Sequence, residues 1–300
     1  MPKMVQLSHS DILREQRKQA RGIHGGYFKM LVAWLGVKLS RLPIPTRSLR
    51  GKLFRSVFGQ KYDSLNEEEA EFPIEDYRTL NAVFTRGLKP ECRPIPETDS
   101  QYLVPCDSRV QEAGEIDQDT IFTAKGIDYT LSSLCPEIDT SCYHNGRYAI
   151  LFLSPVDCHR VFTTQAGRVE EVLHIPGYRL LVHPPFQRKE YPTFTLNERM
   201  VFRIETPLGS CLLIMVAGWG VGDITLPWDP DFHYSSRTVT RKLYDEPVEL
   251  GRCGWLATFN LGSTVIVITE PNSASAALVK ADEKLKYGQP LFHFPKSDEL

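Results

Sequence analysis

The sequence has no apolar run long enough to cross a bilayer, no Cys-x-x-Cys pair, and no internal repeat or low-complexity tract. Met30 to Val37 is apolar but spans only eight residues, whereas a transmembrane helix needs about 20. This stretch also begins too late, and lacks the small-residue cleavage site, for a secretory signal. The seven cysteines are scattered and odd in number, which favours reduced thiols over a disulfide framework or a zinc site. We therefore expect no metal and a location on the cytoplasmic side of a membrane.

The remaining composition is that of an ordinary folded chain. Hydrophobic residues make up 42% of the 300 positions, charged residues make up 24%, and the mean hydropathy is -0.26. These values exclude a polytopic membrane protein. Length alone indicates about two domains, although β-rich folds of this size often form one.

Charge is distributed unevenly behind a net value of -2. Residues 1–61, here called the N-terminal arm, carry 13 Lys and Arg against 2 Asp and Glu, which leaves 22 against 35 for the rest. The arm contains the apolar stretch around Trp34, a composition typical of a helix lying on an anionic membrane surface. A helix packed on the protein's own core explains the pattern equally well. We expect no nucleic-acid partner, because no nucleic-acid-binding module accompanies the charge.

Glycine and proline divide the chain into a helical part and a β part. Residues 14–58 are predicted to form helices broken at Gly25-Gly26 and at Pro43 to Pro45, and residues 77–86 suit another short helix. Short β-rich runs follow at 148–153, 193–194, 200–204, 212–217 and 265–268. The fold class predicted is α+β: a basic, helical, membrane-associating region (residues 1–76), then a compact, mostly antiparallel β catalytic domain (77–300).

One dipeptide near the C-terminus has a chemistry of its own. Gly262-Ser263 stands just ahead of the apolar run Val265 to Ile268. The serine hydroxyl can attack the Gly262 carbonyl, because glycine leaves that carbonyl open and tolerates strained backbone angles. An isolated Gly-Ser is far more often a simple turn entering a strand. Self-cleavage therefore needs support from other residues.

Two further segments supply groups that suit an activated serine. Asp107 lies in a turn, and Asp157 and His159 share a short loop after a predicted strand. A hydroxyl, an imidazole base and an orienting carboxylate together make a serine nucleophilic. Taken alone, His159 is better explained as a structural histidine and Asp107 as a turn-capping carboxylate.

An ordered set of short segments, however, adds support. The segments are Phe84-Thr85-Arg86, Arg93-Pro94-Ile95, Pro105-Cys106-Asp107, Ala124-Lys125-Gly126, Leu153-Ser154-Pro155, Asp157 to Val161, Ile175-Pro176-Gly177, Asn197-Glu198-Arg199, Val221-Gly222, Phe259 to Thr264, and Tyr287 to Leu291. Each segment is weakly specific by itself, whereas their common order and spacing are highly specific. In this order and spacing, over roughly residues 77–293, the chain resembles the phosphatidylserine decarboxylase proenzyme family.

The resemblance implies a self-processing enzyme. Ser263 would attack Gly262, the resulting ester would eliminate, and loss of ammonia would leave a pyruvoyl group derived from Ser263. Residues 1–262 would form the large chain and the small chain would begin at 263. The pyruvoyl ketone would accept the electrons left when phosphatidylserine loses carbon dioxide, giving phosphatidylethanolamine. His159 is the predicted proton donor, Asp107 the activating carboxylate, and Asp157 a supporting residue.

The sequence departs from the family pattern beside His159. Relatives usually carry a second histidine three residues later, which works with the aspartate and serine in self-cleavage, but Phe162 stands here. Ser108 likewise replaces the glycine that commonly follows the aspartate. If the chain matures, His159 or another histidine such as His183 or His174 must act as the base.

Two alternatives stay open at this point. The chain is either a decarboxylase that matures without the second histidine, or an uncleaved, catalytically silent lipid-binding relative. A pyruvoyl enzyme acting on a related serine lipid or a soluble amino acid is the next alternative. The sequence does not fix the oligomeric state, and a homo-oligomer remains open. The retained His159, Asp157 and Gly262-Ser263 favour the active enzyme, because a maturation step that occurs once tolerates a lost base.

Overall fold

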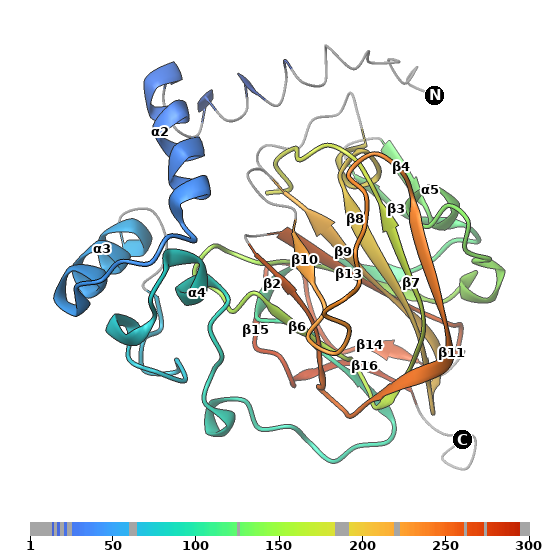
Figure 1. Ribbon diagram of the computed structural model, residues 1–300. Helices are drawn as coiled ribbons and strands as arrows, with labels where there is room; N and C mark the ends of the chain where they lie inside the picture. Colours follow the sequence, from blue (N-terminus) through green and yellow to red (C-terminus); the bar gives the residue numbers. More distant parts are fainter. Residues whose placement is uncertain are drawn as a thin grey trace.

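The computed structural model describes residues 14, 17–18, 21–22, 26–59, 65–124, 127–183, 192–218, 223–260, 263–272 and 275–294. Its helices are α2 (Gly26–Leu39), α3 (Arg47–Gly59), α4 (Leu80–Phe84), α5 (Leu131–Leu134) and α6 (Thr193–Leu196), with 3₁₀ turns at Ile74–Asp76, Pro90–Cys92 and Ser141–Tyr143. Figure 1 shows α2 and α3 at one side of a large β body. The predicted α+β class, with helices first and an antiparallel body after them, is confirmed.

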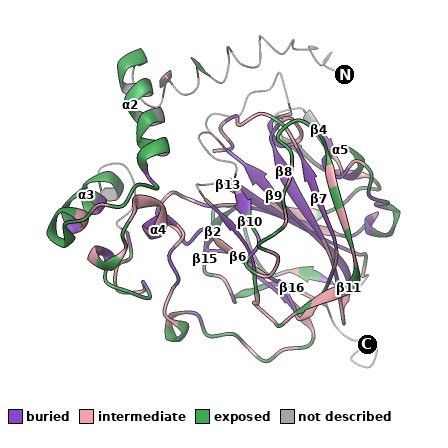
Figure 2. Ribbon diagram, in the orientation of Figure 1, coloured by how far each residue is buried: buried purple, intermediate pink, exposed green. Residues whose placement is uncertain are grey.

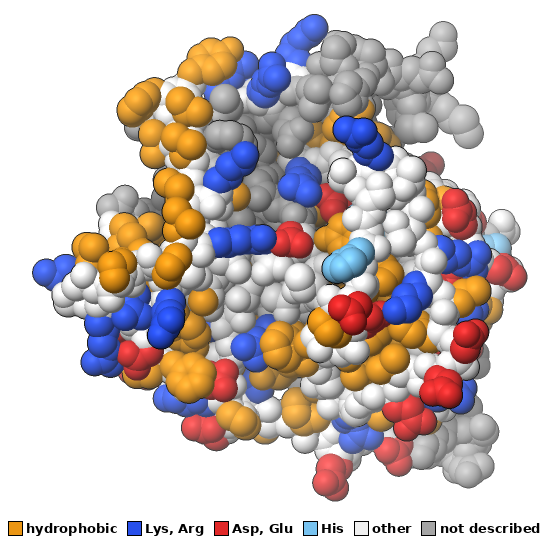
Figure 3. Space-filling view, in the orientation of Figure 1, with side chains coloured by type: hydrophobic (Ala, Val, Ile, Leu, Met, Phe, Trp, Pro, Cys, Tyr) orange, Lys and Arg blue, Asp and Glu red, His pale blue; other side chains and the backbone are white. Residues whose placement is uncertain are grey.

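The two arm helices differ in how they contact the body. Phe54 of α3 is fully buried in a cluster that also includes Ile74 and Phe84. The apolar side chains of α2 are largely exposed instead, with Phe28 77% exposed and Leu31 51% exposed. Figures 2 and 3 show α2 as exposed along its length and lined with apolar side chains, with Lys and Arg nearby. Across the described residues, no helix has both the length and the apolar character to cross a membrane.

The β body is built on one eight-stranded sheet in which every neighbouring pair is antiparallel. Its order is β11-β7-β8-β9-β13-β5-β2-β15, and two three-stranded sheets, β10-β12-β6 and β1-β16-β14, and a β3-β4 hairpin accompany it. The strands are β1 (Gln101–Leu103), β2 (Ser108–Glu115), β3 (Thr120–Ala124), β4 (Ile127–Thr130), β5 (Arg147–Phe152), β6 (Arg160–Phe162), β7 (Gly167–Ile175), β8 (Arg199–Thr206), β9 (Gly209–Ala217), β10 (Ile224–Thr225), β11 (Thr240–Leu250), β12 (Trp255–Phe259), β13 (Ser263–Thr269), β14 (Ala276–Ala277), β15 (Lys284–Leu285) and β16 (Pro290–His293).

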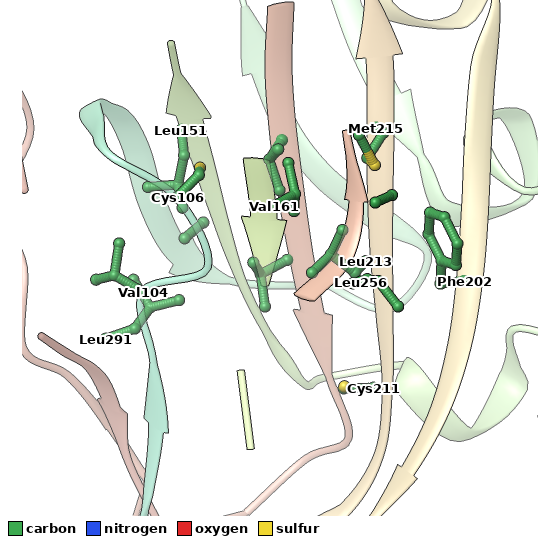
Figure 4. Close-up of a cluster of buried hydrophobic side chains, with 14 of the residues drawn as sticks. Val104, Cys106, Leu151, Val161, Phe202, Cys211, Leu213, Met215, Leu256 and Leu291 are labelled. Atoms are coloured by element: carbon green, nitrogen blue, oxygen red, sulfur yellow. The ribbon is translucent and has the colours of Figure 1, made fainter. Parts of the chain in front are cut away.

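Both faces of the large sheet are buried, which explains the unbroken apolar run in β13. Val265 and Val267 belong to one core cluster, whereas Ile266 and Ile268 belong to the other. Side chains alternate between the faces of a strand, so a strand covered on both faces needs apolar residues at every position. Figure 4 shows the first cluster, with Leu213 of the large sheet near Leu256 of β12.

One predicted strand is wrong. Thr193 and Phe194 begin the short helix α6, in which the N–H of Leu196 donates to the Pro192 carbonyl at 3.0 Å. A β-branched and an aromatic residue favour a strand only weakly, and here the local helical hydrogen bonds determine the conformation. The other predicted runs lie almost entirely within β5, β8, β9 and β13.

Candidate active site

Ser263 is the first residue of the central strand β13. Gly262 lies outside the described residues, and of Ser263 the structure describes the backbone. Ser263 pairs with Ala217 of β9, and Thr264 pairs with both Val216 of β9 and Phe152 of β5. Ala217 is itself fixed, because its N–H donates to the Glu198 carbonyl and its carbonyl accepts from the Asn197 side chain, both at 2.8 Å. The backbone at Ser263 is therefore held by its neighbouring strand.

β5 pairs with β13 on the side opposite to β9, and the loop that follows β5 carries Asp157. The Asp157 carboxylate accepts from the N–H of Ser154 at 2.7 Å, and the N–H of Asp157 donates to the Ser154 carbonyl at 2.9 Å. Ser154 is two residues beyond Phe152, the strand partner of Thr264. Burial raises the pKa of Asp157 to about 6, partly offset by the Ser154 hydrogen bond. Asp157 can therefore hold a proton close to neutral pH.

His159 ends the same loop but faces a different environment. It is fully buried, and its ring stacks on Phe84 of α4 with 3.7 Å between centroids. Its Nδ1 donates to the Asp157 carbonyl at 2.9 Å, so in the neutral ring Nε2 carries the lone pair. Nε2 has no hydrogen-bond partner among the described residues. Burial lowers the pKa of His159 to about 3, which keeps the ring neutral at physiological pH.

Asp107 is buried and its carboxylate is fully engaged. Arg93 donates to it from Nε at 2.9 Å and also from Nη2, and the N–H of Tyr287 donates at 3.0 Å. Arg93 also pairs with Glu69 at 2.7 Å. The two carboxylates hold the pKa of Arg93 above its usual value despite burial. Asp107 is therefore held in place by Arg93 and by the backbone of Tyr287.

Phe162 occupies the position where the resemblance expects a histidine, and its ring has an aromatic partner. It stacks on Tyr287 with 4.1 Å between centroids, and Tyr287 is the residue whose N–H reaches Asp107. The N–H of Phe162 donates to the Pro105 carbonyl at 2.8 Å. Tyr287 thus contacts both residues, Phe162 through its ring and Asp107 through its backbone N–H.

A cavity of about 400 Å³ connects Asp157 with His183. Phe152, Ser154, Arg109 and Lys284 also line it. His183 lies against the Phe152 ring at 4.9 Å between centroids, and burial lowers the pKa of His183. The cavity lies along β2 and the end of β5, and it is linked to β13 through Phe152, the strand partner of Thr264.

His174 is separate from this cavity. It is fully buried, stacks on Tyr234 at 3.9 Å and lies 3.2 Å from Glu198. Glu198 also pairs with Arg179 and lines a second cavity of about 700 Å³. Hydrogen bonds from His174 and Arg179 outweigh burial and lower the pKa of Glu198. Because the Glu198 carbonyl binds Ala217, this network reaches the β9 side of Ser263.

A cut before Ser263 would make this residue the first of a strand that is paired on both sides, so a group formed there would be held in a fixed position. Within the part of the chain that the structure describes, no cluster of three or more His, Cys, Asp or Glu could hold a metal ion.

Sequence reasoning gave no role to three residues that shape the site. Arg93, Glu198 and Tyr287 lie within or beside matched segments, yet nothing in the sequence pairs Arg93 with Asp107 or Tyr287 with Phe162. Buried charges are usually paired, so the position of Asp107 in a turn after an apolar run was a signal to look for a cation such as Arg93.

Comparison with known proteins places this site in a family. The model of a family described as phosphatidylserine decarboxylase matches residues 80–293. A phosphatidylserine decarboxylase proenzyme from Anaeromyxobacter sp. (strain K) is 30% identical over 256 residues, 84% of this chain and 89% of the relative. Proenzymes of the same name from Xanthomonas campestris pv. campestris (strain B100) and Halorhodospira halophila are 36% and 33% identical, covering 72% and 87% of this chain and 78% and 87% of each relative.

The fold and the site together define a lyase that is made as a proenzyme. The matched region contains the whole large sheet, the Asp107 cluster, the Asp157 loop and the Gly262-Ser263 peptide. The chain belongs to the phosphatidylserine decarboxylase family.

Proposed function

We propose that this protein cleaves itself between Gly262 and Ser263 and then decarboxylates phosphatidylserine to phosphatidylethanolamine in phospholipid biosynthesis. The observation that carries the proposal is the match of residues 80–293 to the family, with the Gly-Ser peptide inside the match and Ser263 at the start of a central strand. A pyruvoyl group at Ser263 would supply a ketone that accepts the electron pair left by carbon dioxide.

His159 acts as the base in self-cleavage. As the Ser263 oxygen bonds to the Gly262 carbonyl carbon, the carbon–nitrogen bond breaks, and the hydroxyl proton passes through His159 Nε2 to the released amine. The neutral ring with a free Nε2 lone pair supports this role. A base whose pKa is about 3 accepts protons reluctantly, so maturation is slow.

Asp157 supplies the proton in the decarboxylation. The sequence predicts His159 as this donor, but burial lowers the pKa of His159 to about 3 and raises that of Asp157, which favours Asp157. Asp157 lines the 400 Å³ cavity and its pKa is about 6, so a useful fraction is protonated under working conditions. Arg109 and Lys284 at the same cavity provide positive charge for the phosphate and carboxylate of the headgroup.

Self-cleavage is tested by the mass of the purified protein. Two chains that split after residue 262 support the enzyme, and a carbonyl on the small chain that reacts with hydrazines identifies the pyruvoyl group. The variant Ser263→Ala should remain one chain. An intact wild-type chain of 34.2 kDa would contradict the proposal.

That intact chain would support the second candidate, a silent lipid-binding relative. The observation favouring it is the Phe162 stack, which puts a ring without a proton-accepting group on Tyr287, the residue whose N–H binds Asp107. A silent relative would bind phosphatidylserine vesicles without releasing carbon dioxide.

The substrate is reached by docking the N-terminal arm on an anionic membrane, as a peripheral protein on the cytoplasmic face. Leu31, Leu35 and Phe28 of α2 are exposed, and Lys38, Arg41 and other basic side chains accompany them. An apolar helical face beside cations fits lipid headgroups and the acyl boundary below them. Such docking would cover the face that α2 leaves exposed.

Vesicle binding tests this docking surface. We expect Leu31→Ser to weaken binding to phosphatidylserine vesicles roughly tenfold, because a buried leucine contributes roughly 1.5–3 kcal/mol. Leu243→Ser is the matched control, since Leu243 is similarly exposed but lies on β11. Binding that is equally weakened by both variants would rule out α2 as the docking face, and binding unchanged by salt would rule out the electrostatic part.

A further inference from the structure

Just after α2, two neighbouring residues of the N-terminal arm contact the rest of the protein at two separate points. The Ser40 carbonyl, just after α2, accepts a hydrogen bond from the N–H of Asn81 in α4 at 2.9 Å. The next residue, Arg41, forms an ion pair with Asp223, which lies just before β10. Ser40 is buried, whereas the Arg41–Asp223 pair is exposed.

Both contact points lead to one residue, Asn260. The side-chain amide of Asn81 donates to Asn260 Oδ1 at 3.2 Å. The side-chain amide of Asn260 donates to the Asp223 carbonyl at 2.8 Å, and its backbone N–H donates to the same oxygen at 3.1 Å. Asn260 therefore uses the donor and the acceptor of its side chain at once, which fixes the orientation of the amide.

Asn260 stands where the chain turns from β12 toward the cleavage site. β12 ends at Phe259, whose N–H donates to the His159 carbonyl at 3.0 Å, and Gly262 follows Asn260 by two positions. Beyond the cleavage site, β13 is fixed by its pairing with β9 and β5. Asn260 is thus the last described anchor before the peptide bond that Ser263 attacks.

We propose that Asn260 is a positioning residue for the attack of Ser263 on Gly262, and that the N-terminal arm sets its position through Ser40 and Arg41. This inference rests on the proposed self-cleavage. Intramolecular attack depends steeply on geometry, and a misplacement of about 1 Å can cost roughly 100-fold in rate. Because the arm carries the membrane-docking helix, its seating on the body and the maturation of the enzyme are coupled.

The coupling is tested on the full-length chain by following the appearance of the two chains with time. We expect Asn260→Ala to slow self-cleavage more than about tenfold, because it removes all side-chain hydrogen bonds of the anchor. Asn260→Asp retains an acceptor for Asn81 but loses the donor to the Asp223 carbonyl, so it should also be slow. Asn272→Ala, in the connection between β13 and β14, is the control for a general loss of an asparagine.

The arm is tested separately by charge reversal. Arg41→Asp should slow cleavage about two- to fivefold, since an exposed ion pair contributes little. Arg41→Asp combined with Asp223→Arg should restore the rate, because the exchanged pair again joins the arm to the body. Arg168→Ala is the matched control, since Arg168 is 55% exposed in an ion pair and Arg41 is 56% exposed. These surface variants keep the proposal testable if the Asn260 variants do not fold.

Two readouts separate positioning from general stability. The unfolding temperature of Asn260→Ala should stay close to that of Asn272→Ala while its cleavage rate falls. Hydroxylamine cleaves an ester but leaves a peptide bond intact under mild conditions, so it should release no extra small chain from Asn260→Ala if the block precedes the attack. Wild-type cleavage rates in both Asn260 variants, or an ester that accumulates in them, would overturn the proposal. A wild-type chain that never cleaves would instead overturn the proposed function.

Discussion

Asp157 and His159, on the loop between β5 and β6, lie in different surroundings, and burial shifts their pKa values in opposite directions. Asp157 borders a cavity and its pKa rises to about 6, whereas His159 packs on Phe84 and its pKa falls to about 3. In both cases removal of water disfavours the charged form. One physical cause therefore gives a carboxyl that keeps its proton longer and an imidazole that loses it sooner.

Asp107 shows what happens when a buried carboxylate receives a cation instead. Arg93 and the N–H of Tyr287 neutralise and orient it, so that it contributes charge and structure. The two aspartates look alike in the sequence, and Asp157 and His159 share one loop, yet the three residues lie in different surroundings. In the proposed function Asp157 donates a proton and His159 accepts one, whereas Asp107 stays paired with Arg93.

Of the changes considered, Asp157→Asn should have the largest effect on the decarboxylation rate. Once the variant has matured, we expect its decarboxylation rate to fall about 10²- to 10⁴-fold, the usual effect of losing a general acid. Self-cleavage should continue, because the amide oxygen of asparagine can still accept from Ser154 and hold the loop. The measurements are carbon dioxide release by the mature enzyme and the time course of cleavage by mass spectrometry.

The control is Asp117→Asn, an exposed aspartate in the turn between β2 and β3. It changes the same charge far from the loop and should leave both rates unchanged. If Asp157→Asn releases carbon dioxide as fast as the wild type, the proton comes from another group. His183, in the same cavity, is then the next candidate.

The comparison between the two groups also marks where sequence reasoning ends. The helices of the arm and the central strand were predicted because glycine, proline and apolar runs are local signals. The long strands β7 and β11 were missed, since charged residues interrupt both and Pro247 lies within β11 at a break in its pairing with β7. The pKa of Asp157 and the Arg93–Asp107 pair depend on packing between distant segments, which no local pattern contains.

The opposite pKa shifts of Asp157 and His159 should also appear, as a smaller effect, in the pH dependence of the free energy of unfolding. For Asp157 the folded pKa of about 6 exceeds the ordinary 3.8, so its contribution is intact below about pH 4 and is lost as the pH rises through 6. Asparagine does not ionise, so Asp157→Asn removes this loss of stability. We expect the variant to gain up to roughly 3 kcal/mol over the wild type between pH 4 and pH 7, measured by urea unfolding.

His159 should give the opposite slope. Its folded pKa of about 3 lies below the ordinary 6.5, so its contribution is present above about pH 6.5 and is lost as the pH falls toward 3. His159→Gln should flatten that acid-side loss while Asp157→Asn steepens the net curve. Parallel stability curves for the wild type and both variants would show that burial shifts neither group.

Phe162→His should have the smallest effect, because it adds an imidazole near Asp107, which Arg93 already binds. The new imidazole would take the place of the phenyl ring that stacks on Tyr287. We expect self-cleavage to accelerate about tenfold. This is less than the usual effect of a general base, because Arg93 already pairs with Asp107. Phe162→Leu is the control, because it removes the stack without adding a base. Equal cleavage rates in Phe162→His and Phe162→Leu would mean that the added imidazole takes no part in the proton transfer, and that His159 remains the proposed base of self-cleavage.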